Sequence, residues 1–321
     1  MKGDGRDVVE VVVPRDAHGA RLDRFAAAVA RVSRSELQRW IRDGRVTVDG
    51  APARPSAKVR EGERVSICPE GPAATAARPD PDVRFAVLHV DDDLIVVDKP
   101  AGLVVHPALG HADGTLVNGL LALGLFAGSS FAHDPVRPGI VHRLDKGTSG
   151  VMVVARTPGA REALKAQFQE HSIDRAYVAI VAGEARSATH ATLHGRDPRD
   201  RIRFTTHVTQ GKTAVTHVRV LGPLCGATHV ECTLGTGRTH QIRVHLAESG
   251  TPVVGDSLYG RPSRDPRVRA VAERLGHQAL HARVLGFVHP RSGQRVRYEA
   301  PPPADYLAAL AALAELAPPS S

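Results

Sequence analysis

A stretch without periodic apolar residues, Pro69 to Pro81, divides this chain of 321 residues into a short first part and a long second part. The stretch is rich in Pro, Ala and Gly, a composition typical of linkers, and it offers no apolar face to a core. The chain is also long enough for more than one core, so we expect two domains. The predicted bounds are 20–68 for the first domain, 69–82 for the linker and 83–315 for the second domain.

The first part has the pattern of two short helices followed by a small sheet. Apolar residues recur at i, i+3, i+4 and i+7 over 22–29, and a second apolar stripe over 37–41 ends before Gly44. Apolar and polar residues alternate over 46–48 and lead into the turn Asp49-Gly50, which favours a β-hairpin.

This first part is also basic, with eleven Lys and Arg against six Asp and Glu between Ala20 and Ile67. The whole chain has a formal net charge of +8, which favours a polyanionic partner. Charged runs are more often solvated helix faces, so the arginines alone do not identify an RNA-binding surface.

Two segments resemble the alpha-L RNA-binding module first recognised in a ribosomal protein of the small subunit. They are Arg31 to Glu36 and Trp40 to Gly50. The resemblance implies that the second helix and the following turn lie against RNA phosphates. The RNA-binding residues it implies in this module are Arg34, Ser35, Arg39, Arg42 and Arg45.

Other features of the chain disfavour several protein classes. The apolar runs are too short for a transmembrane helix, and the polar stretch from Met1 to Asp7 lacks the apolar segment of a secretory signal, so we expect a cytoplasmic protein. The three cysteines, Cys68, Cys225 and Cys232, form no close pair, which disfavours a disulfide framework and a cysteine zinc site.

The second part mixes strands and helices without βαβ regularity. Apolar runs over 87–90 and 94–97 flank an acidic turn and predict a hairpin, and Thr157 before Pro158 predicts the start of a helix. A strand is expected over 176–181, and a loop entering a helix over 237–246. We therefore predict an α+β fold in which a small helix-helix-sheet module precedes a large mixed, mostly antiparallel β-sheet domain.

One loop of this part, Gly139 to Gly150, presents Asp145 among basic residues. The runs on either side, Ile140-Val141 and Val151 to Ala155, are apolar and β-branched, and both are predicted to be strands. A single Asp in such a loop commonly caps a turn. Adjacent Arg143 and Lys146 would keep its carboxylate ionised.

A metal site is an alternative to a reactive Asp145, because the chain has several potential histidine ligands. They are His106, His111, His133, His142, His240 and His245. His240 and His245 are five positions apart with no acidic residue between them, which does not fit the His-Glu-x-x-His pattern of zinc hydrolases. We therefore predict no metal site.

Three segments in order, Gly139 to Gly150, Arg175 to Ile180 and Gly237 to Leu246, resemble the signature motifs of the RluA family of pseudouridine synthases. Further matching strings bring nearly the whole chain into the resemblance, which is strongest to the large-subunit synthase D branch. The further strings are Asp98 to Pro100, Gly211 to His217, Gly255-Asp256 and His277 to Ala282.

The resemblance implies an isomerase that needs no cofactor, with Asp145 as the catalytic aspartate, Tyr177 as the active-site tyrosine and Arg243 as the basic partner of Asp145. It implies that Arg143 helps to hold a flipped nucleotide and that Leu144 is its apolar neighbour. A carboxylate suits this reaction as a nucleophile on the ribose or on the uracil ring, or as a stabiliser of charge while a glycal forms.

The expected substrate is large-subunit (23S) ribosomal RNA, within ribosomal precursor particles, and the expected state is a monomer. Two alternatives stay open from the sequence. The same chemistry could act on tRNA or another ribosomal site, or the chain could be a non-catalytic RNA-binding assembly factor.

Overall fold

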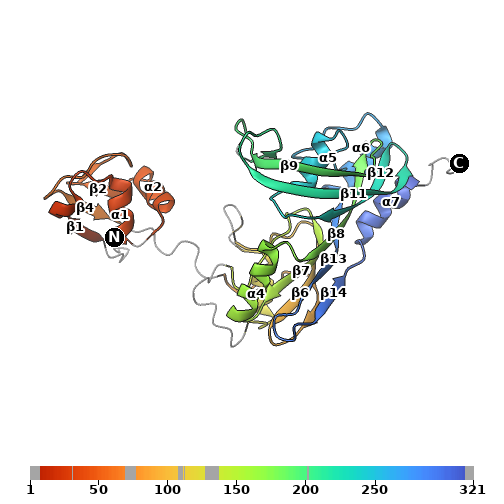
Figure 1. Ribbon diagram of the computed structural model, residues 1–321, viewed down its shortest axis with the longest axis horizontal. Helices are drawn as coiled ribbons and strands as arrows, with labels where there is room; N and C mark the ends of the chain where they lie inside the picture. Colours follow the sequence, from red (N-terminus) through yellow and green to blue (C-terminus); the bar gives the residue numbers. More distant parts are fainter. Residues whose placement is uncertain are drawn as a thin grey trace. The chain divides into compact units, whose positions relative to one another are not determined.

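The computed structural model of the chain describes residues 8–30, 32–68, 77–107, 111, 113–126, 137–200 and 202–314, except the side chains of Ser35 and Glu36. It separates into two compact units, Met1–Thr75 (unit 1) and Ala76–Ser321 (unit 2). Figure 1 shows both, and each is described by itself below. No helix of the described ranges is both long and apolar enough to cross a membrane.

Unit 1 packs two helices on a small antiparallel sheet. Helices α1 (Leu22–Ala30) and α2 (Arg34–Arg42) confirm the two apolar stripes. The sheet has the order β1 (Val9–Val12), β4 (Arg64–Ile67), β2 (Val46–Val48) and β3 (Ala51–Pro52). The hairpin at Asp49-Gly50 is confirmed, since both residues have positive φ. The core between helices and sheet contains the only tryptophan of the chain, Trp40.

Unit 2 is built on one ten-stranded sheet (Figure 1). Its order is β10-β9-β11-β12-β8-β13-β7-β6-β5, and β14 pairs with β13. Among the strands of the described residues, the only parallel pairing joins β13 to β7, so the predicted mostly antiparallel sheet is confirmed. The strands are β5 (Ala86–Val90), β6 (Leu94–Lys99), β7 (Ser149–Ala155), β8 (Asp174–Ala182), β9 (Ala188–Arg196), β10 (Phe204–Thr205), β11 (Lys212–Leu224), β12 (Ala227–Leu234), β13 (Leu280–Val288) and β14 (Arg295–Glu299).

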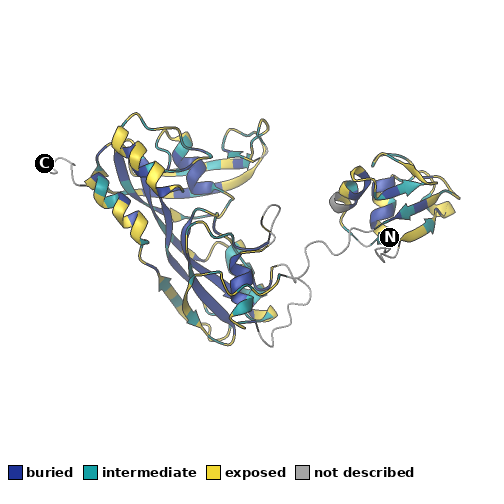
Figure 2. Cartoon of the chain, turned by 180° about the vertical axis from the view of Figure 1, so that it is seen from behind, coloured by how far each residue is buried: buried dark blue, intermediate teal, exposed yellow. Residues whose placement is uncertain are grey.

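Two hydrophobic cores cover different parts of this sheet. The first core joins β6 and β7 to α3 (Leu116–Ala122) and α4 (Pro158–Gln169). The second core joins β8 and β12 to α5 (Gln241–Glu248), α6 (Pro266–Leu275) and α7 (Ala304–Ala314). In Figure 2 the central strands are buried, and β7 is buried along its whole length, whereas the edge strand β5 is largely exposed. Tyr177 of β8 packs against both cores, so it marks the seam between them.

The predicted strand at Ile140-Val141 is wrong. Ile140 makes one isolated bridge to Val154, and the chain then continues as an irregular loop. The cause lies one residue earlier. Gly139 has φ of 67°, and a Cβ there would lie 2.0 Å from the carbonyl oxygen of Ala155, so the chain turns tightly against β7 instead of extending along it.

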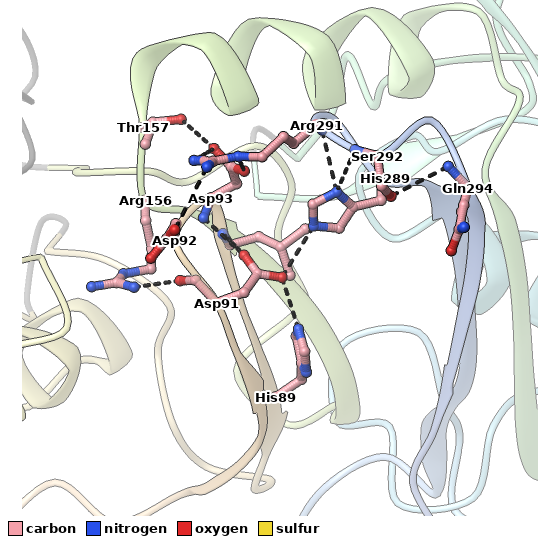
Figure 3. A network of polar contacts seen from close by, with 11 residues as sticks. His89, Asp91, Asp92, Asp93, Arg156, Thr157, His289, Arg291, Ser292 and Gln294 are labelled. Atoms are coloured by element: carbon pink, nitrogen blue, oxygen red, sulfur yellow. Dashed lines mark hydrogen bonds and ion pairs between the residues drawn. The ribbon is translucent and has the colours of Figure 1, made fainter.

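A polar cluster fastens the β5–β6 turn to the loop between β13 and β14 (Figure 3). Asp91 accepts from His89 at 2.8 Å and pairs with His289 at 3.0 Å, and Arg291 pairs with Asp93. The ligand atoms of Asp91, Asp93 and His289 lie within 4.8 Å of one another, a spacing that could suit a cation. Arg291 already supplies the positive charge against Asp93, so we interpret the cluster as a structural contact that holds the β5–β6 hairpin to the β13–β14 hairpin.

Candidate active site

A buried lysine holds the backbone of the loop that carries Asp145. Lys99 of β6 is fully buried, and its Nζ donates to the carbonyl oxygens of Pro100 and Leu103 at 2.8 Å and of Lys146 at 3.3 Å. Three acceptors match the three donors of an ammonium group. Burial lowers the pKa of Lys99 to about 7, although the charges of Asp145 and Asp98 oppose this shift. Lys99 therefore fixes the backbone beside Asp145.

Asp145 pairs with an arginine that is itself clamped. Nη1 of Arg243 donates to Oδ2 of Asp145 at 2.8 Å, across 98 positions of sequence. The other edge of the same guanidinium donates to Asp256, from Nε at 2.7 Å and from Nη2 at 2.9 Å. The Asp256 side chain is fully buried, and its Oδ1 also accepts from the backbone of Leu258 and Tyr259.

The ionised state of Asp256 follows from these contacts. Burial alone raises the pKa of the Asp256 carboxyl, but the hydrogen bonds and charge of Arg243 outweigh burial and the net shift is downward. Asp256 therefore stays negative and holds the planar guanidinium in one orientation, which in turn orients Asp145.

His240 and Tyr177 complete the surroundings of Asp145. Nε2 of His240 lies 3.7 Å from Oδ1 of Asp145, and its Nδ1 is 2.8 Å from the Tyr259 hydroxyl. His240 has φ of 59°, an uncommon left-handed conformation directly before α5. Burial lowers its pKa, although Asp145 opposes the shift, so the imidazole is neutral at pH 7. Burial also raises the pKa of Tyr177, which keeps its phenol protonated.

These side chains line a cavity of about 70 Å³. Asp145, Tyr177 and Arg243 lie in its wall with Arg143 and Leu144. Leu144 is 5% exposed and also belongs to the first core, whereas Arg143 is exposed. The sequence-predicted catalytic residues and their two loop neighbours therefore meet at one place. A larger hollow of about 690 Å³ adjoins the cavity and shares Arg143, Asp145 and Tyr177 with it.

The predicted RNA-binding residues of unit 1 differ in their surroundings. Arg34 pairs with the fully buried Asp23 at 3.0 Å, so its guanidinium also stabilises α1. Arg39 and Arg42 are exposed on α2, and Arg45 is half-buried after it. The side chain of Ser35 lies outside the described residues.

Three residues of the site were not assigned roles from the sequence: Lys99, His240 and Asp256. Each lies in a string that resembles the family, but the type of contact could not be read from it. Asp256 in particular follows Arg243 by 13 positions across the end of α5, and only the fold shows that their side chains meet.

The described histidines of the metal alternative are engaged in other contacts. His245 makes hydrogen bonds through both ring nitrogens, to Thr216 at 2.8 Å and to Thr192 at 2.9 Å. His142 accepts from the backbone of Val153 at 3.1 Å. His106 contacts the carbonyl oxygen of Pro107, and His111 lies 3.1 Å from Nζ of Lys146. His133 lies outside the described residues.

Comparison with known proteins shows the family of the chain. Residues 93–248 match the family described as RNA pseudouridylate synthase, and residues 20–65 match the S4 domain. The chain is 45% identical over 313 residues to ribosomal large subunit pseudouridine synthase D of Xanthomonas campestris, covering 95% of this chain and 92% of that protein. It is 44% identical over 302 residues to the Pseudomonas aeruginosa protein of the same name, covering 92% of each.

A solved structure supports the same grouping. Human RNA Pseudouridylate Synthase Domain Containing 1 superposes with a TM-score of 0.54 at 26% identity, covering 70% of this chain and 86% of that one. Both resemblances found in the sequence are thereby confirmed. The chain belongs to the RNA pseudouridylate synthase family, and it is an isomerase with an S4 domain ahead of its synthase domain.

Proposed function

We propose that this enzyme converts uridine to pseudouridine in large-subunit ribosomal RNA, with Asp145 as the catalytic carboxylate and without a cofactor. The observation that carries the proposal is the chain of contacts from Asp256 through Arg243 to Asp145, beside Tyr177 in one cavity. The choice of RNA follows its relatives in Xanthomonas campestris and Pseudomonas aeruginosa, both named ribosomal large subunit pseudouridine synthase D.

The reaction breaks the bond between N1 of uracil and C1′ of ribose and forms a bond between C5 and C1′. N1 gains a proton and C5 loses one, so the atoms balance without an outside reactant. Asp145 assists as a nucleophile on the ribose or on the ring, or by stabilising charge on a glycal, and Arg243 holds its carboxylate in one orientation. Tyr177 offers a ring for stacking, and its hydroxyl can take part in removing the C5 proton.

The target base has to leave its helical stack to reach this cavity. Arg143 is exposed at the mouth of the cavity, and its long side chain can occupy the space that the flipped nucleotide leaves. Leu144 beside it supplies apolar contact. The arginines of the S4 domain, Arg34, Arg39, Arg42 and Arg45, with Ser35, bind RNA phosphates and hold the substrate.

In the cell, we expect the enzyme to act as a monomer on ribosomal precursor particles in the cytoplasm. Pseudouridine mapping in a deletion strain identifies the RNA. Pseudouridine signals that vanish from large-subunit RNA and return with the wild-type gene support the proposed substrate. Signals that vanish from tRNA or small-subunit RNA instead contradict it and identify that RNA as the substrate.

Rescue with Asp145→Asn tests the catalytic role, because the amide keeps the shape and removes the negative charge. We expect conversion to be abolished and RNA affinity to stay within about twofold, since phosphate contacts supply most binding. Asp174→Asn is the matched control, since Asp174 lies on β8, pairs with Arg295 and lines neither cavity. Full conversion by Asp145→Asn contradicts the assignment.

A further inference from the structure

The hollow beside the active site contains a buried arginine with unused donors. Arg175 is 8% exposed, and its Nε and Nη2 have almost no accessible surface and no hydrogen-bond partner among the described residues. Buried polar groups without partners are rare and costly, and a buried charge is more costly still. Arg175 is therefore retained at a cost to stability, which points to a partner that binds from outside the chain.

The position of Arg175 directs it toward the substrate. Side chains two residues apart on a strand share a face, so Arg175 and Tyr177 of β8 point to the same side of the sheet. Both line the 690 Å³ hollow that adjoins the cavity of Asp145. Phe168 of α4 lies alongside, with its ring centre 5.8 Å from the guanidinium carbon.

The space for this guanidinium depends on a glycine. A Cβ at Gly237 would lie 2.3 Å from Nη1 of Arg175, too close for any other residue without moving the arginine. Gly237 does not have a positive φ, so its backbone conformation does not itself require glycine. The absence of a side chain at 237 thus leaves Arg175 room in the wall of the hollow.

The unpartnered edge of Arg175 has the geometry to bind a phosphate once the side chain turns, because this edge is enclosed in the structure and must open to the hollow. Nε and Nη2 form one edge of the planar guanidinium, the same edge with which Arg243 grips both oxygens of Asp256. Such an edge binds two oxygens of a carboxylate or phosphate together. Arg143, Lys165 and Arg238 also line the hollow, against Asp145 and Glu162, so the wall carries a net positive charge.

The geometry points to a phosphate subsite: Arg175 binds a backbone phosphate of the RNA strand that carries the target uridine, directly beside the base held at Asp145. This inference rests on the proposed function, since it assumes an RNA substrate at the cavity. It assigns to Arg175 the positioning of the RNA strand, separate from the chemistry at Asp145.

The test compares Arg175→Gln with wild type on a short stem-loop containing the mapped uridine. Each flanking phosphate, 5′ and 3′, is replaced in turn by an uncharged methylphosphonate. We expect Arg175→Gln to lower kcat/KM about 10- to 100-fold on the natural stem-loop, the range for losing a charged hydrogen bond. One methylphosphonate should lower kcat/KM of wild type by a similar factor and have little further effect on the variant.

Stability separates this role from a structural one. Removing a buried charge whose Nε and Nη2 lack hydrogen-bond partners should outweigh the lost contact with the Phe168 ring, so the melting temperature of Arg175→Gln should be equal to or above that of wild type. Arg219→Gln is the control, because Arg219 pairs with Glu231 on the sheet and lines neither the cavity nor the hollow. A variant that melts lower or fails to fold shows that Arg175 has a structural role and overturns the proposal. The proposal is also overturned if each methylphosphonate lowers kcat/KM of Arg175→Gln by the same factor as kcat/KM of wild type.

Failure of the proposed function gives a different result. If wild type binds the stem-loop without converting uridine, the synthase assignment fails, and the same comparison is made on Kd. A methylphosphonate that weakens binding by wild type but not by Arg175→Gln still supports the phosphate subsite.

Discussion

Arg243 is the residue on which the geometry of the site depends, because one guanidinium contacts two carboxylates. Its partner Asp256 is buried and fixed, whereas Asp145 is partly exposed at 18% and faces the cavity. Asp256 therefore fixes Nε and Nη2 of the arginine, and Nη1 contacts Asp145. Substitution of Asp256 should disturb the contact with Asp145 without removing a group that contacts the substrate.

We expect Asp256→Asn to lower kcat about 10- to 100-fold while leaving Kd for RNA nearly unchanged. The substitution replaces one of the two oxygens that accept from Arg243 with an NH2 donor, so the paired contact is lost. Breaking a buried ion pair costs about 3–5 kcal/mol of stability. Single-turnover conversion measures the rate of the chemical step, filter binding measures Kd for RNA, and thermal melting measures stability. Asp256→Glu keeps the charge and should recover part of kcat, and a wild-type kcat in Asp256→Asn would contradict the anchoring role.

At the scale of elements, α1 and α2 of unit 1 are joined through one buried carboxylate. Asp23 of α1 has no exposed side-chain surface and accepts from Arg21 at 3.1 Å, from Arg34 of α2 at 3.0 Å and from Gln38 of α2 at 2.6 Å. The hydrogen bond from Arg21 and those from Gln38 and Arg34 lower the pKa of Asp23 from its ordinary 3.8. The position of α2 against α1 thus depends on an ionised Asp23.

The sign of this shift predicts acid sensitivity of unit 1. A carboxyl with a lowered folded-state pKa stabilises the fold above its ordinary pKa, and this stabilisation is lost as pH falls below about 4. Trp40 is the only tryptophan and lies in the core of unit 1, so its fluorescence follows the unfolding of that unit in the full chain. We expect its melting temperature to fall more steeply with acid in wild type than in Asp23→Asn.

At neutral pH, Asp23→Asn itself should destabilise unit 1 by about 1–3 kcal/mol, the cost of breaking buried hydrogen bonds. Equal acid slopes in the two proteins would show that other carboxylates dominate the acid response.

At the scale of the whole molecule, the two units should divide the work of capture and chemistry. Removing residues 1–75 deletes unit 1 and leaves the cavity of unit 2 complete. We expect the truncated chain to convert a short stem-loop at a rate near that of the full chain, but to bind long ribosomal RNA more weakly and with a shallower salt dependence. Loss of conversion on the stem-loop would contradict this division.

The sequence predicted what depends on local pattern. The helices over 22–30 and 34–42, the hairpin at Asp49-Gly50 and the mostly antiparallel sheet follow from periodicity and turn residues. The strand at Ile140-Val141 failed because Gly139 turns the chain there, and a run of two residues cannot reveal that.

The meeting of Asp145, Tyr177 and Arg243 came from family resemblance, since contacts across 98 positions have no local signal. The contacts of Asp256, Lys99 and His240 became visible only in the fold, for the same reason. Each acts through a side chain or backbone group that is remote in sequence or hidden in an irregular loop.

The contact between Asp145 and Arg243 joins the two cores of unit 2, so it can form only after the chain has been synthesised through both of them. The residue before Asp145 belongs to the first core, and the residue before Arg243 belongs to the second. During synthesis, Asp145 is therefore added to the chain 98 residues before Arg243. Strand β13, the parallel neighbour of β7, is synthesised later still. On the proposed function, a chain terminated before residue 243 carries Asp145 without Arg243, and we expect such a fragment to convert no uridine.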